Sequence, residues 1–244
     1  AHSANTSTLA GSALTGNLRT ARLSLTRPIT HARAVRLRAG RPFAVLARRD
    51  VLGLRRQRVD LVAGAGFTVL GAAVLIWGMA QPAAPSFALG LAMVPLYLGF
   101  GSWAEGLRLQ ADNIGTPALI GTGPLAEAAA HLVAPTLLAA IVLGLAGGFT
   151  PAVWAAGLPV LALLAGGHLL AAFRGDPPAT MVTPQGRLFW YAMPSVTVVL
   201  VGAFLAQAYR TGNPAPAAFC TILVAAVAAW GVSRVRRLTY RHRT

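Results

Sequence analysis

Long apolar stretches without a charged side chain alternate with short polar segments along most of this chain. No Asp, Glu, Lys or Arg occurs in residues 61–104, 128–173, 188–209 or 211–233. A helix needs roughly 20 apolar residues to cross the hydrocarbon layer of a membrane. The first two stretches are therefore long enough for two crossings each, and the last two for one crossing each. The pattern predicts an all-α integral membrane protein with about six transmembrane helices.

Polar and proline-containing segments set the limits of these predicted spans. The prolines of the QPAAP segment, residues 81–85, end the first span because proline lacks a backbone donor and disfavours helix before it. Longer polar segments at 105–127 and 173–187 separate the second span from the third and the fourth from the fifth. We therefore place the spans at about 61–80, 86–104, 128–147, 152–172, 188–208 and 215–233.

The two ends of the chain are basic rather than apolar. Residues 1–40 are rich in Ala, Thr, Ser and Arg without a strong period, so they are interpreted as a partly disordered arm or as the end of a preceding domain. Residues 41–60 carry apolar side chains at spacings of three to five between arginines, which predicts an amphipathic interfacial helix; the alternative is a basic flank that orients the first span. Residues 234–244 are predicted to form a basic cytoplasmic tail.

Arginine is distributed unevenly across the predicted membrane. All 21 basic residues are Arg, and the formal net charge is +15. With the N-terminus inside, the inner segments hold 20 of these residues and the outer turns hold only Arg210. Cytoplasmic segments carry the excess of basic residues in membrane proteins, so both termini are predicted to be cytoplasmic. Arginines at the membrane edges favour anionic lipids over nucleic acid as partners. The lysine-free, Ala/Gly/Arg-rich composition indicates a bacterial plasma membrane.

Signatures of enzyme chemistry do not occur in the chain. A P-loop is impossible without lysine, and there is no nucleophile elbow, HExxH or CxxC motif. The lone Cys220 lies in an apolar span, and five dispersed histidines do not make a metal site. We therefore predict no ATP hydrolysis, cofactor or metal in this chain.

Polar and proline residues inside the spans are the candidates for a pathway or gate. His131 and His168 lie in predicted spans, where a polar side chain either handles substrate or protons or bonds to a neighbouring helix. Pro135 and Pro194 each remove one backbone hydrogen bond inside a span, which indicates either a gating kink or the ordinary frequency of proline in membrane helices.

Two segments resemble parts of the membrane domain of type-2 ABC exporters. ARRDVLGLRR, residues 47–56, is similar to the cytosolic connector helix that precedes the first span in that family. The loop after the second span begins with an acidic residue and continues with PALIGTGPL, similar to the segment that docks on the ATPase subunit. The resemblance implies a connector helix with Arg48, Arg49, Asp50, Arg55 and Arg56, and ATPase-coupling residues Glu105, Pro117, Leu119, Ile120, Pro124 and Leu125.

The resemblance also implies how the protein works. A permease of this family pairs with a second six-helix membrane domain, from a dimer or a duplicated chain, and with a nucleotide-binding ATPase subunit that holds ATP and Mg²⁺. Because the chain begins at Ala1 without Met, we expect it to be part of a longer protein. Two alternatives stay open: a membrane enzyme acting on lipid-linked substrates with Glu105, Asp112 and His131, and an accessory scaffold subunit of a membrane complex.

Overall fold

The computed structural model describes residues 40–81, 83–116, 121–148 and 151–243, and none of these residues lies in a β-strand. The described residues are helical, as predicted, and six of the helices are long and apolar enough to cross a membrane, the number that the sequence predicts. The helices are α3 (Pro42–Arg56), α4 (Arg58–Ala80), α5 (Ser86–Trp103), α6 (Glu105–Asp112), α7 (Pro124–Gly147), α8 (Pro151–Ala172), η1 (Ala179–Met181), α9 (Pro184–Thr211) and α10 (Pro214–Arg243).

Several helices extend beyond the apolar stretches that predicted them. Helix α7 begins at Pro124 in the polar segment, and α10 continues through the basic residues after Ser233 as far as Arg243. Apolar length predicts only the part of a helix that lies in hydrocarbon, and arginine favours helix almost as strongly as leucine. The residues expected as a tail are therefore helical as far as Arg243, and the predicted arm, residues 1–39, lies outside the described residues.

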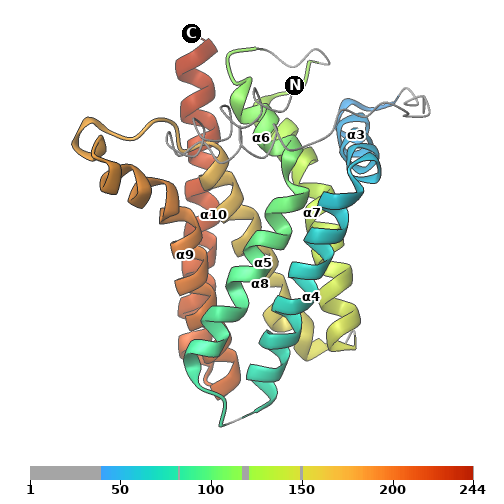
Figure 1. Ribbon diagram of the computed structural model, residues 1–244, viewed down its shortest axis with the longest axis vertical. Helices are drawn as coiled ribbons and strands as arrows, with labels where there is room; N and C mark the ends of the chain where they lie inside the picture. Colours follow the sequence, from blue (N-terminus) through green and yellow to red (C-terminus); the bar gives the residue numbers. More distant parts are fainter. Residues whose placement is uncertain (1–39, 82, 117–120, 149–150, 244) are drawn as a thin grey trace, which may run out of the picture.

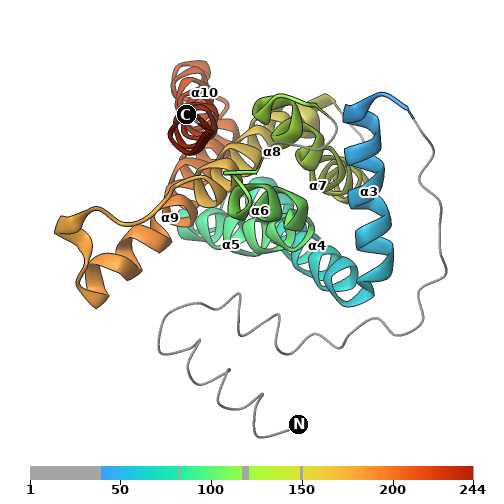
Figure 2. The same cartoon turned by 90° about the horizontal axis from the view of Figure 1, so that it is seen from above.

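The amphipathic segment forms a separate helix that lies across one end of the bundle. Figure 1 shows α4 descending along the bundle axis, whereas α3 is seen nearly end-on, and the view in Figure 2 shows α3 running across that end. Gln57, with φ −93° and ψ 67°, breaks the helix, so residues 58–60 belong to α4. Helix α6 and the end of α10 lie at the same end as α3 (Figure 1). We call this the polar end of the bundle.

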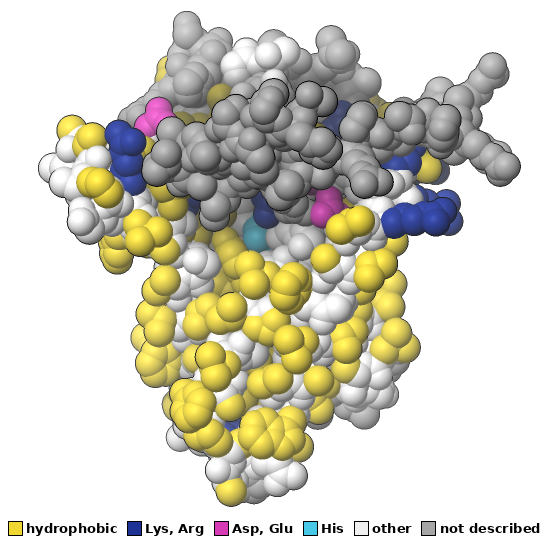
Figure 3. Space-filling model, in the orientation of Figure 1, with side chains coloured by type: hydrophobic (Ala, Val, Ile, Leu, Met, Phe, Trp, Pro, Cys, Tyr) yellow, Lys and Arg dark blue, Asp and Glu magenta, His cyan; other side chains and the backbone are white. Residues whose placement is uncertain are grey.

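Helices α5 and α8 lie at the centre of the bundle. In their most apolar windows 56% and 61% of the residues are buried, against 22% in both α9 and α10. The outer helices therefore expose apolar side chains along their length, as the yellow surface below the polar end shows in Figure 3. An apolar band of this height is what a lipid-facing surface requires.

Glycines allow the closest helix contacts. On α4, Gly64, Gly71 and Gly78 recur every seven residues and face α5, where a Cβ added to any of them would fall closer than 3.0 Å to an atom of α5. Gly166 of α8 and Gly231 of α10 allow a similar approach between those two helices. Small residues at such contacts let membrane helices gain packing energy that apolar burial cannot supply in lipid.

At the opposite end of the bundle, the only described arginine forms hydrogen bonds between helices. Arg210, near the end of α9, donates from Nη1 to the carbonyls of Gly78 at 3.3 Å and Ala84 at 2.7 Å, and from Nη2 to Ser86 Oγ at 3.2 Å. These bonds join α9 to the α4–α5 turn. The single arginine expected in the outer turns thus satisfies backbone carbonyls that the turn leaves without helical donors.

Candidate functional site

A buried hydrogen bond between His131 and Asp50 attaches α3 to α7. Nδ1 of His131 lies 2.5 Å from Oδ2 of Asp50, and the two side chains are 0% and 9% exposed. Because a carboxylate only accepts hydrogen bonds, Nδ1 carries the proton. Nε2 of His131 has no hydrogen-bond partner among the described residues, so Asp50 is the group that orients the ring. Arg49 Nε lies farther from this carboxylate, at 3.8 Å from Oδ1 of Asp50.

Helix α6 contacts this hydrogen-bonded pair through a glycine. A Cβ at Gly106 would fall within 3.0 Å of both Asp50 carboxylate oxygens and His131 Nδ1. The backbone of α6 therefore lies directly against the pair, a closeness that only glycine permits. Three helices that the sequence separates, α3, α6 and α7, thus meet at one point of the polar end.

The residues expected to couple to an ATPase lie around α6, as far as they are described. Glu105 begins α6 and accepts a hydrogen bond from Arg108 at 3.3 Å. Pro124 begins α7, and its carbonyl accepts from Gln110 Nε2 at 2.8 Å, while Leu125 packs on a small core with Leu107. Pro117, Leu119 and Ile120 lie outside the described residues. The described members are therefore close together, at the junction of α6 with α7.

The arginines of the predicted connector helix point away from this junction. Arg48, Arg49, Arg55 and Arg56 are exposed on α3, whereas Leu46 and Leu54 on its other face are buried. This division is the amphipathic pattern expected from the sequence. The guanidiniums of Arg48, Arg55 and Arg56 can reach lipid headgroups or a protein partner, since long basic side chains extend to polar surroundings, whereas Arg49 also lies 3.8 Å from Asp50.

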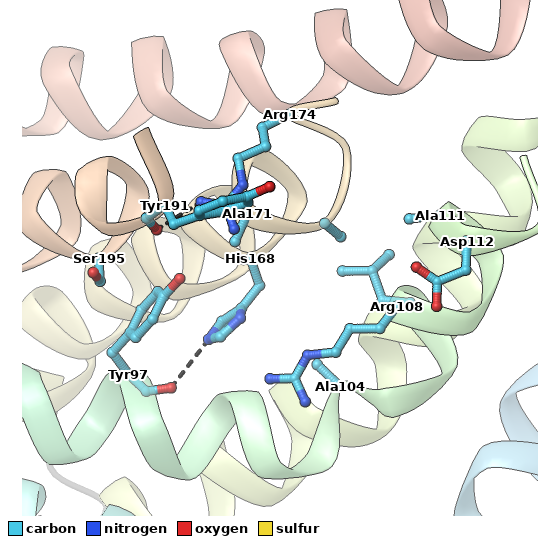
Figure 4. A pocket seen from close by; sticks show the side chains of 12 residues that line it. Tyr97, Ala104, Arg108, Ala111, Asp112, His168, Ala171, Arg174, Tyr191 and Ser195 are labelled. Atoms are coloured by element: carbon cyan, nitrogen blue, oxygen red, sulfur yellow. Dashed lines mark hydrogen bonds between the residues drawn. The ribbon is translucent and has the colours of Figure 1, made fainter. Parts of the chain in front are cut away.

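A cavity of about 440 Å³ lies beside α6, between α5, α8 and the start of α9 (Figure 4). Alanines and Leu107 form its apolar wall. The sequence singled out only two of its polar lining residues, His168 and Asp112. The polar lining residues, which come from several elements of the bundle, are Tyr97, Arg108, Asp112, His168, Arg174, Tyr191 and Ser195.

His168 is held in this cavity by aromatic stacking. Its ring lies 4.2 Å from that of Tyr97 and 5.2 Å from that of Phe100, both with an interplanar angle of 13°. Nε2 donates to the Tyr97 carbonyl at 3.1 Å, because a carbonyl only accepts (Figure 4). Gly101 leaves the room for this arrangement, since a Cβ there would meet the His168 ring. His168 is therefore a fixed part of the cavity wall, 5% exposed.

Pro194 explains where Arg174 lies. Proline has no N–H, so Pro194 cannot donate to the carbonyl of Trp190 four residues earlier in α9. Arg174 Nη1 donates to that carbonyl at 3.2 Å and to the carbonyl of Tyr191 at 2.6 Å, and its guanidinium lies 4.3 Å above the Tyr191 ring. Burial lowers the pKa of the Arg174 guanidinium, which nevertheless stays charged at neutral pH. Arg174, which the sequence did not single out, thus donates to the carbonyl that Pro194 leaves without a helical donor.

The predicted pathway residues do not form one site. His131 is hydrogen-bonded to Asp50, His168 lies in the cavity, and Pro135 and Pro194 lie inside different helices. Pro135 removes the helical donor to the carbonyl of His131, again four residues earlier. Of the residues in the enzyme alternative, Glu105 bonds to Arg108, His131 bonds to Asp50, and Asp112 lines the cavity with His168.

No group of three or more potential metal ligands occurs among the described residues. Comparisons of the chain with models of protein families, with curated proteins and with solved structures found no match. The function is therefore argued from the geometry of the polar end and of the cavity.

Proposed function

We propose that the chain is a permease subunit, or half-subunit, of an ABC-type exporter in the bacterial plasma membrane. One observation carries the proposal: the buried Asp50–His131 pair attaches the basic helix α3 to the transmembrane helix α7 directly beside α6. In this proposal the polar end is cytoplasmic, and a separate ATPase holds ATP and Mg²⁺. The chain itself supplies no catalytic residue.

The junction of three helices gives such a partner a mechanical connection to the spans. A displacement of α6 is transmitted to Asp50 and His131 by the Gly106 backbone, because no flexible side chain lies between them. From His131 it continues into α7, a helix of 24 residues. Packed interfaces of this kind move as rigid bodies between discrete arrangements rather than deforming continuously. ATP-driven movement of the loop around α6 would thus tilt a span.

The outer surface fits pairing with a second six-helix domain. Helices α9 and α10 expose large apolar side chains, including Phe204, Phe219 and Ile222, which are 61–66% exposed. Either lipid or a second membrane domain satisfies such a surface. Two copies, or two halves of a longer chain, would enclose the translocation pathway between them, with anionic lipids around the arginines of the polar end.

Association with an ATPase tests the proposal directly. The full chain is expected to co-purify from native membranes with a Walker-motif ATPase, and the complex is expected to hydrolyse ATP. Replacing residues 117–125 with a Gly/Ser linker of equal length should abolish the association. The matched control replaces residues 81–85, the turn at the opposite end, and should leave it intact. Association that survives the first replacement would contradict the proposed docking segment, and a chain that purifies without an ATPase would contradict the exporter.

A membrane enzyme acting on lipid-linked substrates is the second candidate, and the polar cavity is the observation that favours it. His168 and Tyr97 line the cavity together with Arg108 and Arg174. The test is turnover of a lipid-linked substrate by the isolated chain. Turnover lost in His168→Ala, with the fold retained, would favour the enzyme over the permease.

A further inference from the structure

We propose that the cavity between α5, α6, α8 and α9 binds the phosphate group of a membrane phospholipid, with Arg174 and Arg108 as its cationic ligands. The proposal concerns this chain alone and does not depend on an ATPase partner. It rests on an uncompensated charge, on the polar groups around it and on the position of the opening.

The uncompensated charge belongs to Arg174. Its side chain is partly buried, and among the described residues its hydrogen bonds go from Nη1 to two neutral carbonyls. No carboxylate of the described part of the chain lies within ion-pair distance of it. Removing a cation from water is costly unless an anion compensates it. The geometry leaves Nε and Nη2 as donors for an anion in the cavity.

The surrounding polar groups suit a phosphate. Arg108 reaches into the cavity from α6, on the other side of His168 from Arg174, and the Tyr97 hydroxyl points toward Arg174 (Figure 4). Ser195 lines the cavity from α9, with its hydroxyl donating to the Ala192 carbonyl at 2.7 Å, and Asp112 lies beyond Arg108 in the same view. Guanidiniums donate in a planar fork that matches the oxygens of phosphate, and charge-assisted bonds of this kind are the stronger ones. The Arg174 guanidinium, the Tyr97 hydroxyl and the Arg108 guanidinium, which also donates to Glu105 at 3.3 Å, supply the donors for a phosphodiester.

The position of the opening favours a lipid over a soluble anion. Figure 3 shows a basic and a histidine side chain in a hollow where the yellow apolar band meets the polar end. Leu107 and four alanines line the cavity, and Leu188 and Phe189, on the first turns of α9, are 71% and 60% exposed. A headgroup at this depth leaves its acyl chains beside the apolar band, where they replace water on the exposed side chains.

Calorimetric titration of the full chain in neutral detergent tests the proposal. Short-chain phosphatidylglycerol is expected to bind. Diacylglycerol with the same acyl chains, which lacks the phosphate, should not bind, and inorganic phosphate should bind at least tenfold more weakly than the lipid. Inorganic phosphate that binds as tightly as phosphatidylglycerol would show a soluble-anion site and overturn the lipid assignment. Diacylglycerol that binds equally well would overturn the role of the phosphate.

Charge-removing variants locate the site. Arg174→Gln and Arg108→Gln should each weaken phosphatidylglycerol binding roughly tenfold to a hundredfold, the usual effect of losing a charge-assisted bond. The matched control Arg236→Gln, on the exposed surface of α10, should leave the Kd unchanged. Because Arg174→Gln also removes the donor to two carbonyls, melting curves check its fold. Arg108→Gln carries the test if Arg174→Gln does not fold. Equal binding by wild type and folded variants would overturn the proposal.

Discussion

Nδ1 of His131 on α7 lies 2.5 Å from Oδ2 of Asp50 on α3, and the two residues are 81 positions apart in the chain. Asp50→Ala should therefore detach α3, because it leaves the buried His131 ring without its orienting partner. We expect a loss of about 1–3 kcal/mol of stability, the range for an unsatisfied buried polar group. Thermal unfolding in detergent measures the loss, and trypsin should cleave faster after Arg55 and Arg56.

Two further variants make this prediction specific. Arg49→Gln removes the distant and exposed neighbour of Asp50 at 3.8 Å and should cost less than about 1 kcal/mol, like other surface ion pairs. Adding His131→Leu to Asp50→Ala should recover part of the lost stability, because the unsatisfied ring is then gone. Strictly additive losses would contradict a direct interaction between the two side chains.

The α6 backbone leaves no room for a side chain at Gly106. Gly106→Ala should push α6 away from the Asp50–His131 pair and lower the melting temperature, since the added Cβ would meet both residues. Gly53→Ala on α3 is the matched control, because its Cβ meets nothing within 4 Å. That change should stabilise the protein by about 0.5–1 kcal/mol through the higher helix propensity of alanine. A Gly106→Ala protein as stable as the wild type would contradict the close approach of α6.

Hydrophobic pattern and proline placement predicted the spans because a membrane helix must carry its own apolar surface and satisfy its own backbone. The sequence singled out His131 as a polar group in a predicted span, and Asp50 by the arginines beside it. Their pairing depends on how α3 lies across α7, which no local pattern contains. Arg174 was missed for the same reason, although Pro194 marks the Trp190 carbonyl as lacking a helical donor.

Helices α4 and α5 touch at backbone distance around Gly71. A Cβ at this position would lie 2.8 Å from the Ala92 carbonyl oxygen and the Leu96 nitrogen, backbone atoms that cannot move independently. Gly71→Ala should therefore separate the helices and destabilise the protein by about 1–3 kcal/mol. Gly66→Ala, on the same helix with nothing within 4 Å, should be neutral or stabilising. Melting temperatures of the two variants compare these effects, and equal values would contradict the predicted contact.

The first turns of α9 lean away from α10, whereas the later turns run beside it (Figure 1). Pro194 lies inside α9, and bends of this kind in helices are most often caused by proline. Pro194→Ala restores a donor to the Trp190 carbonyl, so α9 should straighten and Arg174 should lose one of its two carbonyl partners. Spin labels at Leu188→Cys and Arg236→Cys should then move closer together in pulsed electron spin resonance. Pro159→Ala in α8 is the control, and an unchanged distance in Pro194→Ala would contradict the proposed cause of the bend.

Arginine distribution predicts which end of the bundle is cytoplasmic. Arg108, Arg174 and the basic residues of α3 and α10 belong to the polar end, and Arg210 lies at the other end. The positive-inside rule therefore places Gln81 and Asn213, in the turns beside Arg210, outside the cell.

In a Cys220→Ser background, a membrane-impermeant maleimide applied to intact cells should label Gln81→Cys and Asn213→Cys. It should label Thr183→Cys and Arg236→Cys only after permeabilisation, because these exposed positions lie at the polar end. The reverse pattern would place the polar end outside, and with it the helices α3 and α6 that the proposed ATPase must reach.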